Sequence, residues 1–137
     1  MLGEKIGSER GKVTSRRIIP GDDKMSFIKM EITVEMETTV YGVSGMNIGT
    51  YVVYERGPGQ MFGEGQGIIM TNDGDGIIWQ GVGVGRGEED GSIAMAASIV
   101  CQTTSEKLAK LNHLLVLVEQ KADMAGSASS ELYEWKA

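Results

Sequence analysis

Hydrophobic and polar residues alternate most regularly between residues 30 and 41. One set of alternate positions holds Met30, Ile32, Val34, Met36 and Val40, and the other set is polar, with glutamates at 31, 35 and 37. A period of two is the side-chain period of a β-strand, so this segment predicts a strand with one buried face and one wet, acidic face.

Shorter apolar or alternating runs separated by turn residues predict further strands. We expect eight strands, at residues 4–19, 30–41, 50–56, 60–71, 76–87, 92–103, 114–122 and 132–136. Turns are expected at 20–23, 57–59, 72–75 and 88–91, where glycine, proline, asparagine and acidic residues gather, and a loop is expected at 125–129.

The period changes only once, after residue 103. Thr103 and Glu106 have the spacing of a capping box, and Leu108, Leu111 and Leu115 follow at helical spacing. This pattern predicts one short helix near residues 104–112.

Glycine recurs at alternate positions in two bursts. The first burst is Gly63, Gly65 and Gly67, and the second comprises Gly81, Gly83, Gly85 and Gly87. Glycine weakens a strand and offers no side chain for packing, so its repeated use indicates tight curvature, close backbone approach or a need for space. A small closed barrel has these needs.

Together the patterns predict an all-β fold, an eight-stranded antiparallel up-and-down barrel with one short helix, in a single domain over residues 1–137. Eight strands enclose an interior just wide enough for side chains or one small ligand. A two-layer sandwich fits the same pattern and stays open as the alternative.

Composition and charge exclude several function classes. The net charge is −6 without a basic cluster, which argues against nucleic acid as a partner. No apolar run has membrane-spanning length and the N-terminus has no apolar signal core, so we expect no membrane partner. Single Cys101 excludes an internal disulfide and fits the reducing cytoplasm, where we expect the protein.

No cofactor or metal is expected. Each glycine burst lies within a predicted strand that another strand follows, whereas a dinucleotide site needs a helix after the glycines. One histidine and one cysteine do not build a zinc site. His113 is interpreted as a cap or surface residue rather than a catalytic base, and Cys101 as a small buried hydrophobe.

Candidate site residues depend on the register of the two glycine strands. With a two-residue turn at Asp73–Gly74, positions whose numbers sum to 147 face each other, so that Glu64 lies opposite Gly83. The face holding Phe62, Glu64 and Gln66 with Trp79 on the partner strand is then the candidate lining, and Glu64 is its polar centre. The opposite face, with Gln80 and Arg86, is the rival lining, and a slip of one residue would exchange the faces.

Four segments carry a family resemblance. They are the stretches 61–71, 79–86, 102–112 and 132–135, with similarity also at 21–23 and 47–51. The chain resembles a family of small uncharacterised bacterial proteins with the eight-stranded barrel of allene oxide cyclase, which the plant dirigent proteins share. The resemblance implies this fold and a bacterial source, and it transfers no catalytic residue.

Three functions follow as hypotheses. The first is a barrel that binds one small apolar molecule, oriented by Glu64 or Gln66. The second is a cyclase- or isomerase-like enzyme that uses one interior carboxylate, and the third is a packed barrel acting as an oligomeric interaction protein. We also expect a homo-oligomer, a dimer rather than a trimer, with Tyr51, Val53, Tyr133 or Trp135 supplying contact area on the outer face.

Overall fold

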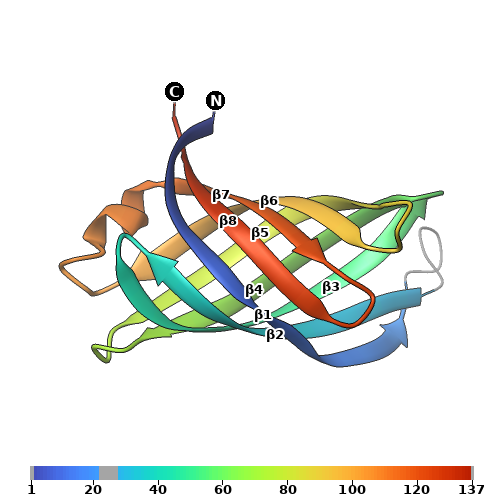
Figure 1. Cartoon of the computed structure of the whole chain (residues 1–137), viewed down its shortest axis with the longest axis horizontal. Helices are drawn as coiled ribbons and strands as arrows, with labels where there is room; N and C mark the ends of the chain where they lie inside the picture. Colours follow the sequence, from blue (N-terminus) through green and yellow to red (C-terminus); the bar gives the residue numbers. More distant parts are fainter. Residues whose placement is uncertain (1, 22–27, 137) are drawn as a thin grey trace.

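The computed structural model describes residues 2–21 and 28–136, which form one closed barrel of eight strands (Figure 1). The strands are β1 (Leu2–Pro20), β2 (Ile28–Val40), β3 (Val43–Gly57), β4 (Gln60–Thr71), β5 (Gly76–Gly87), β6 (Ile93–Thr103), β7 (Leu115–Ala122) and β8 (Ser127–Trp135). The turn expected at 20–23 extends outside the described residues, because 22 and 23 are not among them.

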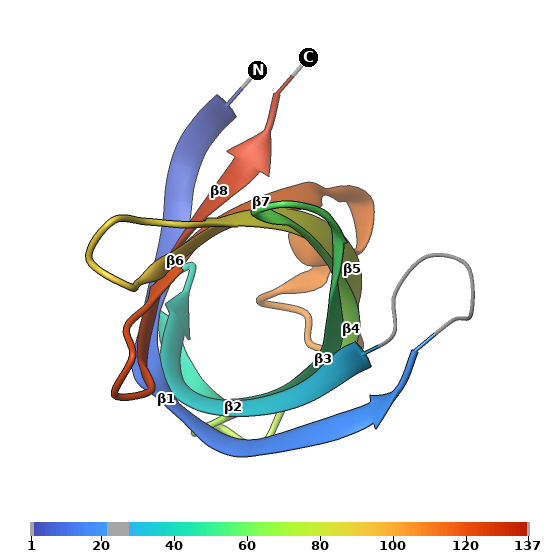
Figure 2. The same ribbon diagram turned by 90° about the vertical axis from the view of Figure 1, so that its right-hand side faces the viewer.

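Every strand pairs antiparallel with its neighbours in chain order, and β1 pairs with β8 to close the ring. Figure 2, which looks at one end of the barrel, shows the strands as a ring around the axis. The predicted all-β, eight-stranded antiparallel barrel is therefore confirmed, and the sandwich alternative is not the fold.

The strands begin and end close to the predicted positions, except for β3 and β8. β3 begins at Val43 rather than near residue 50, because Tyr41 (φ 48°) and Gly42 (φ 76°) make a two-residue turn that pairs Val40 with Val43. Positive φ at both turn residues is the geometry of a type I′ hairpin. β8 begins at Ser127, inside the segment where a loop was expected.

The predicted helix is a 3₁₀-helix, η1 (Ala109–His113), and no side chain caps it. The Thr103 hydroxyl accepts the N–H of Ser105 instead (3.1 Å), so the expected capping box does not form. Leu108 and Leu111 of this segment are almost completely buried, at 0% and 2% exposure, and they pack at one end of the barrel core.

Asn112 holds this segment against β6. Its side-chain oxygen accepts the Thr103 N–H (2.8 Å) and its amide donates to the Thr103 carbonyl (3.0 Å). The Asn112 side chain thus satisfies the backbone N–H and C=O of Thr103, as a neighbouring strand would. We call residues 108–113 the plug, because they cover one end of the barrel core.

Candidate ligand site inside the barrel

The register between β4 and β5 decides which candidate residues face the interior. Gly63 pairs with Gly83 and Glu64 with Val82, so facing positions sum to 146 rather than 147. The turn is longer than expected, because the Thr71 N–H donates to the Asp75 carbonyl (2.8 Å) across Asn72, Asp73 and Gly74. The register expected from a two-residue turn is therefore wrong by one residue.

This shift turns most of the candidate side chains outward. Glu64, Gln66 and Gln80 are exposed. Phe62 packs on the outer side against Tyr54, with 5.4 Å between the centroids of the two rings. Phe62, Gln66 and Gln80 are not among the residues that line the interior cavity, whereas Glu64 is among them although it is exposed.

Arg86 also lies outside the core. Its guanidinium forms an ion pair with Glu88 (3.3 Å) and lines a hollow of about 470 Å³ formed by residues of β5 to β8. Because Glu119, Lys121 and Glu131 also line this hollow, it carries charges of both signs.

Trp79 is the one candidate whose side chain points inward, and glycines make room for it. A methyl group added at Gly49 would lie 2.4 Å from the indole, and one at Gly67 would lie 2.5 Å from it. Both contacts are far too short for real atoms, so the glycine faces of β3 and β4 form the seat of the indole. The glycine ladder therefore lines the interior.

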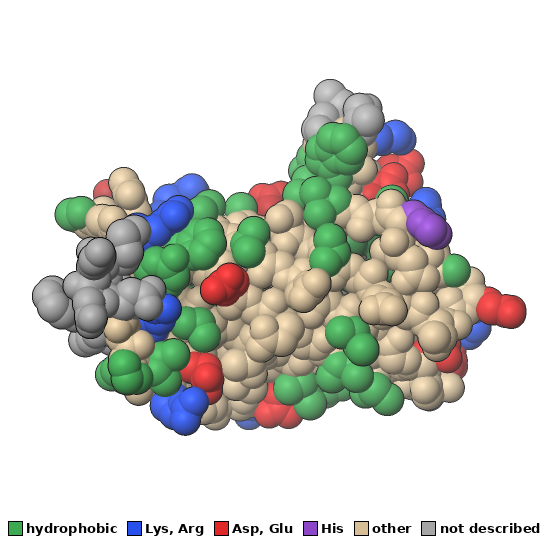
Figure 3. All heavy atoms as spheres, turned by 180° about the vertical axis from the view of Figure 1, so that it is seen from behind, with side chains coloured by type: hydrophobic (Ala, Val, Ile, Leu, Met, Phe, Trp, Pro, Cys, Tyr) green, Lys and Arg blue, Asp and Glu red, His purple; other side chains and the backbone are tan. Residues whose placement is uncertain are grey.

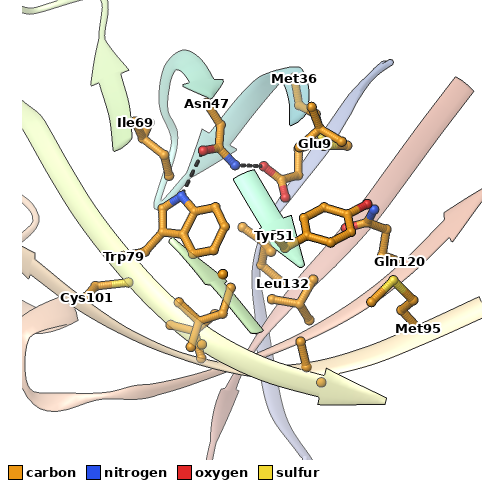
Figure 4. Close-up of a pocket in the computed structure, with 18 of the residues that line it drawn as sticks. Glu9, Met36, Asn47, Tyr51, Ile69, Trp79, Met95, Cys101, Gln120 and Leu132 are labelled. Carbon is orange, nitrogen blue, oxygen red and sulfur yellow. Dashed lines mark hydrogen bonds between the residues drawn. The ribbon is translucent and has the colours of Figure 1, made fainter. Parts of the chain in front are cut away.

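A chain of hydrogen bonds starts at Trp79 and crosses the barrel (Figure 4). The indole Nε1–H donates to Asn47 Oδ1 (2.8 Å), and Asn47 Nδ2 donates to Glu9 Oε2 (2.8 Å). The hydroxyl of Thr38 donates to the same carboxylate oxygen (2.7 Å). Thr38 and Asn47 are buried, at 2% and 5% exposure. Since each bond satisfies a buried polar group, the chain fixes Glu9, Asn47 and Trp79 as one unit.

An interior cavity of about 100 Å³ adjoins this chain. Apart from the polar chain its walls are mostly aliphatic side chains and bare glycine backbone, including Val34, Met36, Ile69, Gly81, Gly83, Met95, Ala97, Ile99 and Val118. The volume is below the range of about 300–1,000 Å³ typical of drug-sized ligands. It is closer to the cavity of about 150 Å³ that holds benzene in a well-studied engineered protein.

Tyr51 lines the same cavity, although it was expected on the outer face. Burial raises the pKa of its hydroxyl, and the side chain of Gln120 and the charge of Arg16 partly oppose this effect. Gly65 accommodates the tyrosine, because an added methyl group there would lie 2.5 Å from Tyr51 Cβ. Tyr51 is therefore an interior residue.

Cys101 and His113 occupy the environments expected of them. Cys101 lines the cavity and packs against the core, and burial raises the pKa of its thiol to about 11. His113 is exposed at the end of η1, and its imidazole is visible on the surface in Figure 3. Neither residue offers a nucleophile or base to the cavity.

Across residues 2–21 and 28–136, no group of three or more histidine, cysteine or acidic residues could hold a metal ion. No helix in that part of the chain is long and apolar enough to span a membrane.

Sequence reasoning missed Glu9 and Asn47. Glu9 lies between Gly7 and Gly11 at alternate positions, which is the same glycine spacing that marks the interior face of β4 and β5. Added methyl groups at Gly7 and Gly11 would both lie 2.1 Å from backbone oxygens of β2. Treating alternate glycines as the marker of the inner face would have placed Glu9 inside.

Comparisons with known proteins bear on the fold. No protein-family model and no curated protein matches the sequence. A Clostridium acetobutylicum protein of unknown function has a similar structure, with 14% identity, a TM-score of 0.82 and coverage of 97% of this chain and 98% of that one. A β-barrel-like protein from Acinetobacter baumannii has 12% identity and a TM-score of 0.83, covering 99% and 96% of the two chains.

An enzyme from Penicillium herquei is also similar, with 15% identity, a TM-score of 0.65 and coverage of 96% of this chain and 92% of that one. At these identities the likeness shows a shared fold alone. The bacterial neighbours are uncharacterised β-barrel proteins, as the sequence resemblance implied, and the specific kinship with allene oxide cyclase stays a prediction.

Proposed function

We propose that the protein binds one small, mostly apolar molecule inside its barrel. The cavity of about 100 Å³ beside the Glu9–Asn47–Trp79 chain is the observation that carries this proposal. Aliphatic walls give affinity through burial of apolar surface, and a few fixed polar groups orient a ligand. The cavity argues against the packed barrel, whose interior would be filled.

Size sets a limit on the ligand. A molecule of about five to eight heavy atoms matches the cavity, and at most about 1.5 kcal/mol per heavy atom can be gained on binding. For a probe of five heavy atoms this ceiling is about 7.5 kcal/mol, so we expect its dissociation constant in the micromolar to millimolar range.

The test uses isobutanol as the probe and Trp79 as the reporter. A Trp135→Phe background removes the other, exposed tryptophan, so that fluorescence reports the interior indole. We expect a saturable fluorescence change on titration, confirmed by ligand-detected NMR.

Two neighbouring alanines provide a matched pair of variants. Ala97 lines the cavity, whereas Ala96 is exposed on the outer side of the same strand. Ala97→Leu should fill the cavity and abolish binding, and Ala96→Leu should leave it unchanged. Equal binding by both variants, or no saturable binding to the unchanged barrel, would refute the proposal.

A second candidate is a cyclase- or isomerase-like enzyme that uses Glu9 as its acid–base group. Two hydrogen bonds hold the Glu9 carboxylate at the cavity wall, where a general base must lie. The similarity to the Penicillium herquei enzyme is consistent with it. Native mass spectrometry distinguishes the two functions. An enzyme should retain substrate in Glu9→Gln and product in the wild type, whereas a binding protein retains the same molecule in both.

A further inference from the structure

The polar end of the cavity carries a carboxylate whose hydrogen-bond partners are neutral. Glu9 accepts from the hydroxyl of Thr38 and the amide of Asn47. Among the ion pairs of the described residues, none includes Glu9. A charge beside apolar walls is costly unless an opposite charge accompanies it. The site therefore favours a ligand that brings a positive charge.

The other residues that line the cavity also favour a cationic ligand over an anionic one. They include no lysine and no arginine, so no side chain there would compensate an anionic ligand. An anion would also be repelled by Glu9 at short range.

Two aromatic side chains, those of Trp79 and Tyr51, line the same cavity as the carboxylate. In Figure 4, Trp79 and Tyr51 lie to the left and right below the Glu9–Asn47 hydrogen bond, with part of a strand drawn between them. The indole N–H is already donated to Asn47, so the indole would contact a ligand through its ring rather than through a hydrogen bond. Indole and phenol faces attract organic cations, most strongly where water is displaced.

We propose that the ligand of this site is a small protonated amine with a compact hydrocarbon group. Its ammonium group donates to Glu9 in the cavity that Trp79 and Tyr51 also line, and its hydrocarbon part contacts the aliphatic walls. This assignment rests on the proposed binding function and adds the chemical class of the ligand.

The experiment compares probes that share one carbon skeleton. Isobutylamine, isobutanol and isobutyrate have almost the same size and differ in charge, so each is titrated into the Trp135→Phe barrel at neutral pH and fixed ionic strength. We expect the amine to bind at least tenfold more tightly than the alcohol and isobutyrate not to bind.

Variants test the role of the carboxylate. Glu9→Gln keeps the shape and the acceptor for Asn47 while removing the charge, so it should lower the affinity for isobutylamine to that of isobutanol. Glu37→Gln, an identical change at an exposed position of β2 that does not line the cavity, should have no effect. The comparison of the three probes on the unchanged barrel stands even if Glu9→Gln fails to fold.

The outcomes separate the two proposals. Isobutanol binding as tightly as isobutylamine, or isobutyrate binding more tightly than either, would overturn the assignment to amines and leave the binding function in place. An amine preference that persists in Glu9→Gln would also overturn it. Failure of all three probes to bind would refute the binding function itself.

Discussion

Trp79 occupies the interior because two residues that face it have no side chain. Gly49 and Gly67 lie against the indole, and its N–H reaches Asn47 only from this seat. The glycines thus determine the position of the Trp79–Asn47 hydrogen bond without taking part in it. Adding one methyl group at a glycine tests this dependence.

We expect Gly67→Ala to destabilise the barrel by about 1–3 kcal/mol, the usual cost of overpacking a core. The added methyl group would lie 2.5 Å from the indole and 2.6 Å from the Ile48 carbonyl. Gly63→Ala is the matched control, because its methyl group would meet other atoms only at 3.4 Å or more. Urea unfolding measures both variants, and equal stabilities would contradict the role of Gly67.

The partly buried thiol of Cys101 makes the free energy of unfolding depend on pH in the alkaline range. Its pKa is about 11 in the folded protein and near 9 when exposed, so the unfolded chain loses its proton first. The free energy of unfolding should therefore fall between about pH 9 and 11. Cys101→Ala should remove this part of the decline. Urea unfolding of both proteins across this pH range provides the measurement. If the free energy of unfolding depends on pH in the same way in both, the fold does not raise the pKa of the thiol.

Which residues face the inside of the barrel could be predicted only in part. The apolar face of 34–40 and the packing of the partly buried Cys101 against the core follow from alternation and composition. The placement of Glu64 failed because one turn residue changes which face points inward, and local patterns around Asn72–Gly74 do not fix the length of the turn. Glu9 was hidden because its strand is rich in charge on the outer face.

Among the elements, η1 shows how a short segment closes one end of the barrel. Leu108 and Leu111 enter the core, and Asn112 replaces a strand partner for Thr103. The leucine spacing predicted a helical turn correctly. Its 3₁₀ form was not predictable, because leucine spacing does not distinguish a 3₁₀ turn from one turn of α-helix, and the hydrogen bonds of Asn112 to β6 are tertiary contacts.

Truncation of Leu111 tests this plug. Leu111→Ala should cost about 2–5 kcal/mol of folding free energy and enlarge the cavity that the side chain lines. Leu115→Ala, at a leucine that is 36% exposed, should change stability by less than about 0.5–1 kcal/mol. Thermal and urea unfolding provide the measurement. A mild effect of Leu111→Ala would mean that the plug is not part of the cooperative core.

For the barrel as a whole, the outer surface carries exposed apolar side chains. Figure 3 shows several groups of them on one side of the molecule. Ile48, Ile68 and Ile78 lie opposite one another on β3, β4 and β5 and are 44%, 39% and 58% exposed. Contiguous apolar side chains on an exposed sheet face are typical of an interaction surface.

We expect this face to support self-association, with a dimer as the first species. Sedimentation velocity over a range of concentrations should show it, and Ile68→Lys should shift the equilibrium toward monomer. Ser129→Lys, an exposed position on β8, serves as the control. Wild-type protein that stays monomeric at high concentration would contradict this expectation.

The pairing of the first strand with the last has a consequence for how the chain folds. Lys12 lies opposite Ser127 and Leu2 opposite Trp135, and an ion pair between Lys5 and Glu131 crosses the same seam. These contacts join the most distant parts of the chain, so loop-closure entropy opposes them until the other strands are in place, and such topologies fold in about milliseconds to seconds. A chain synthesised only as far as β7 has open edges on both β1 and β7, and unpaired edges recruit other strands. Completion of β8 is therefore the step that protects the nascent barrel from aggregation.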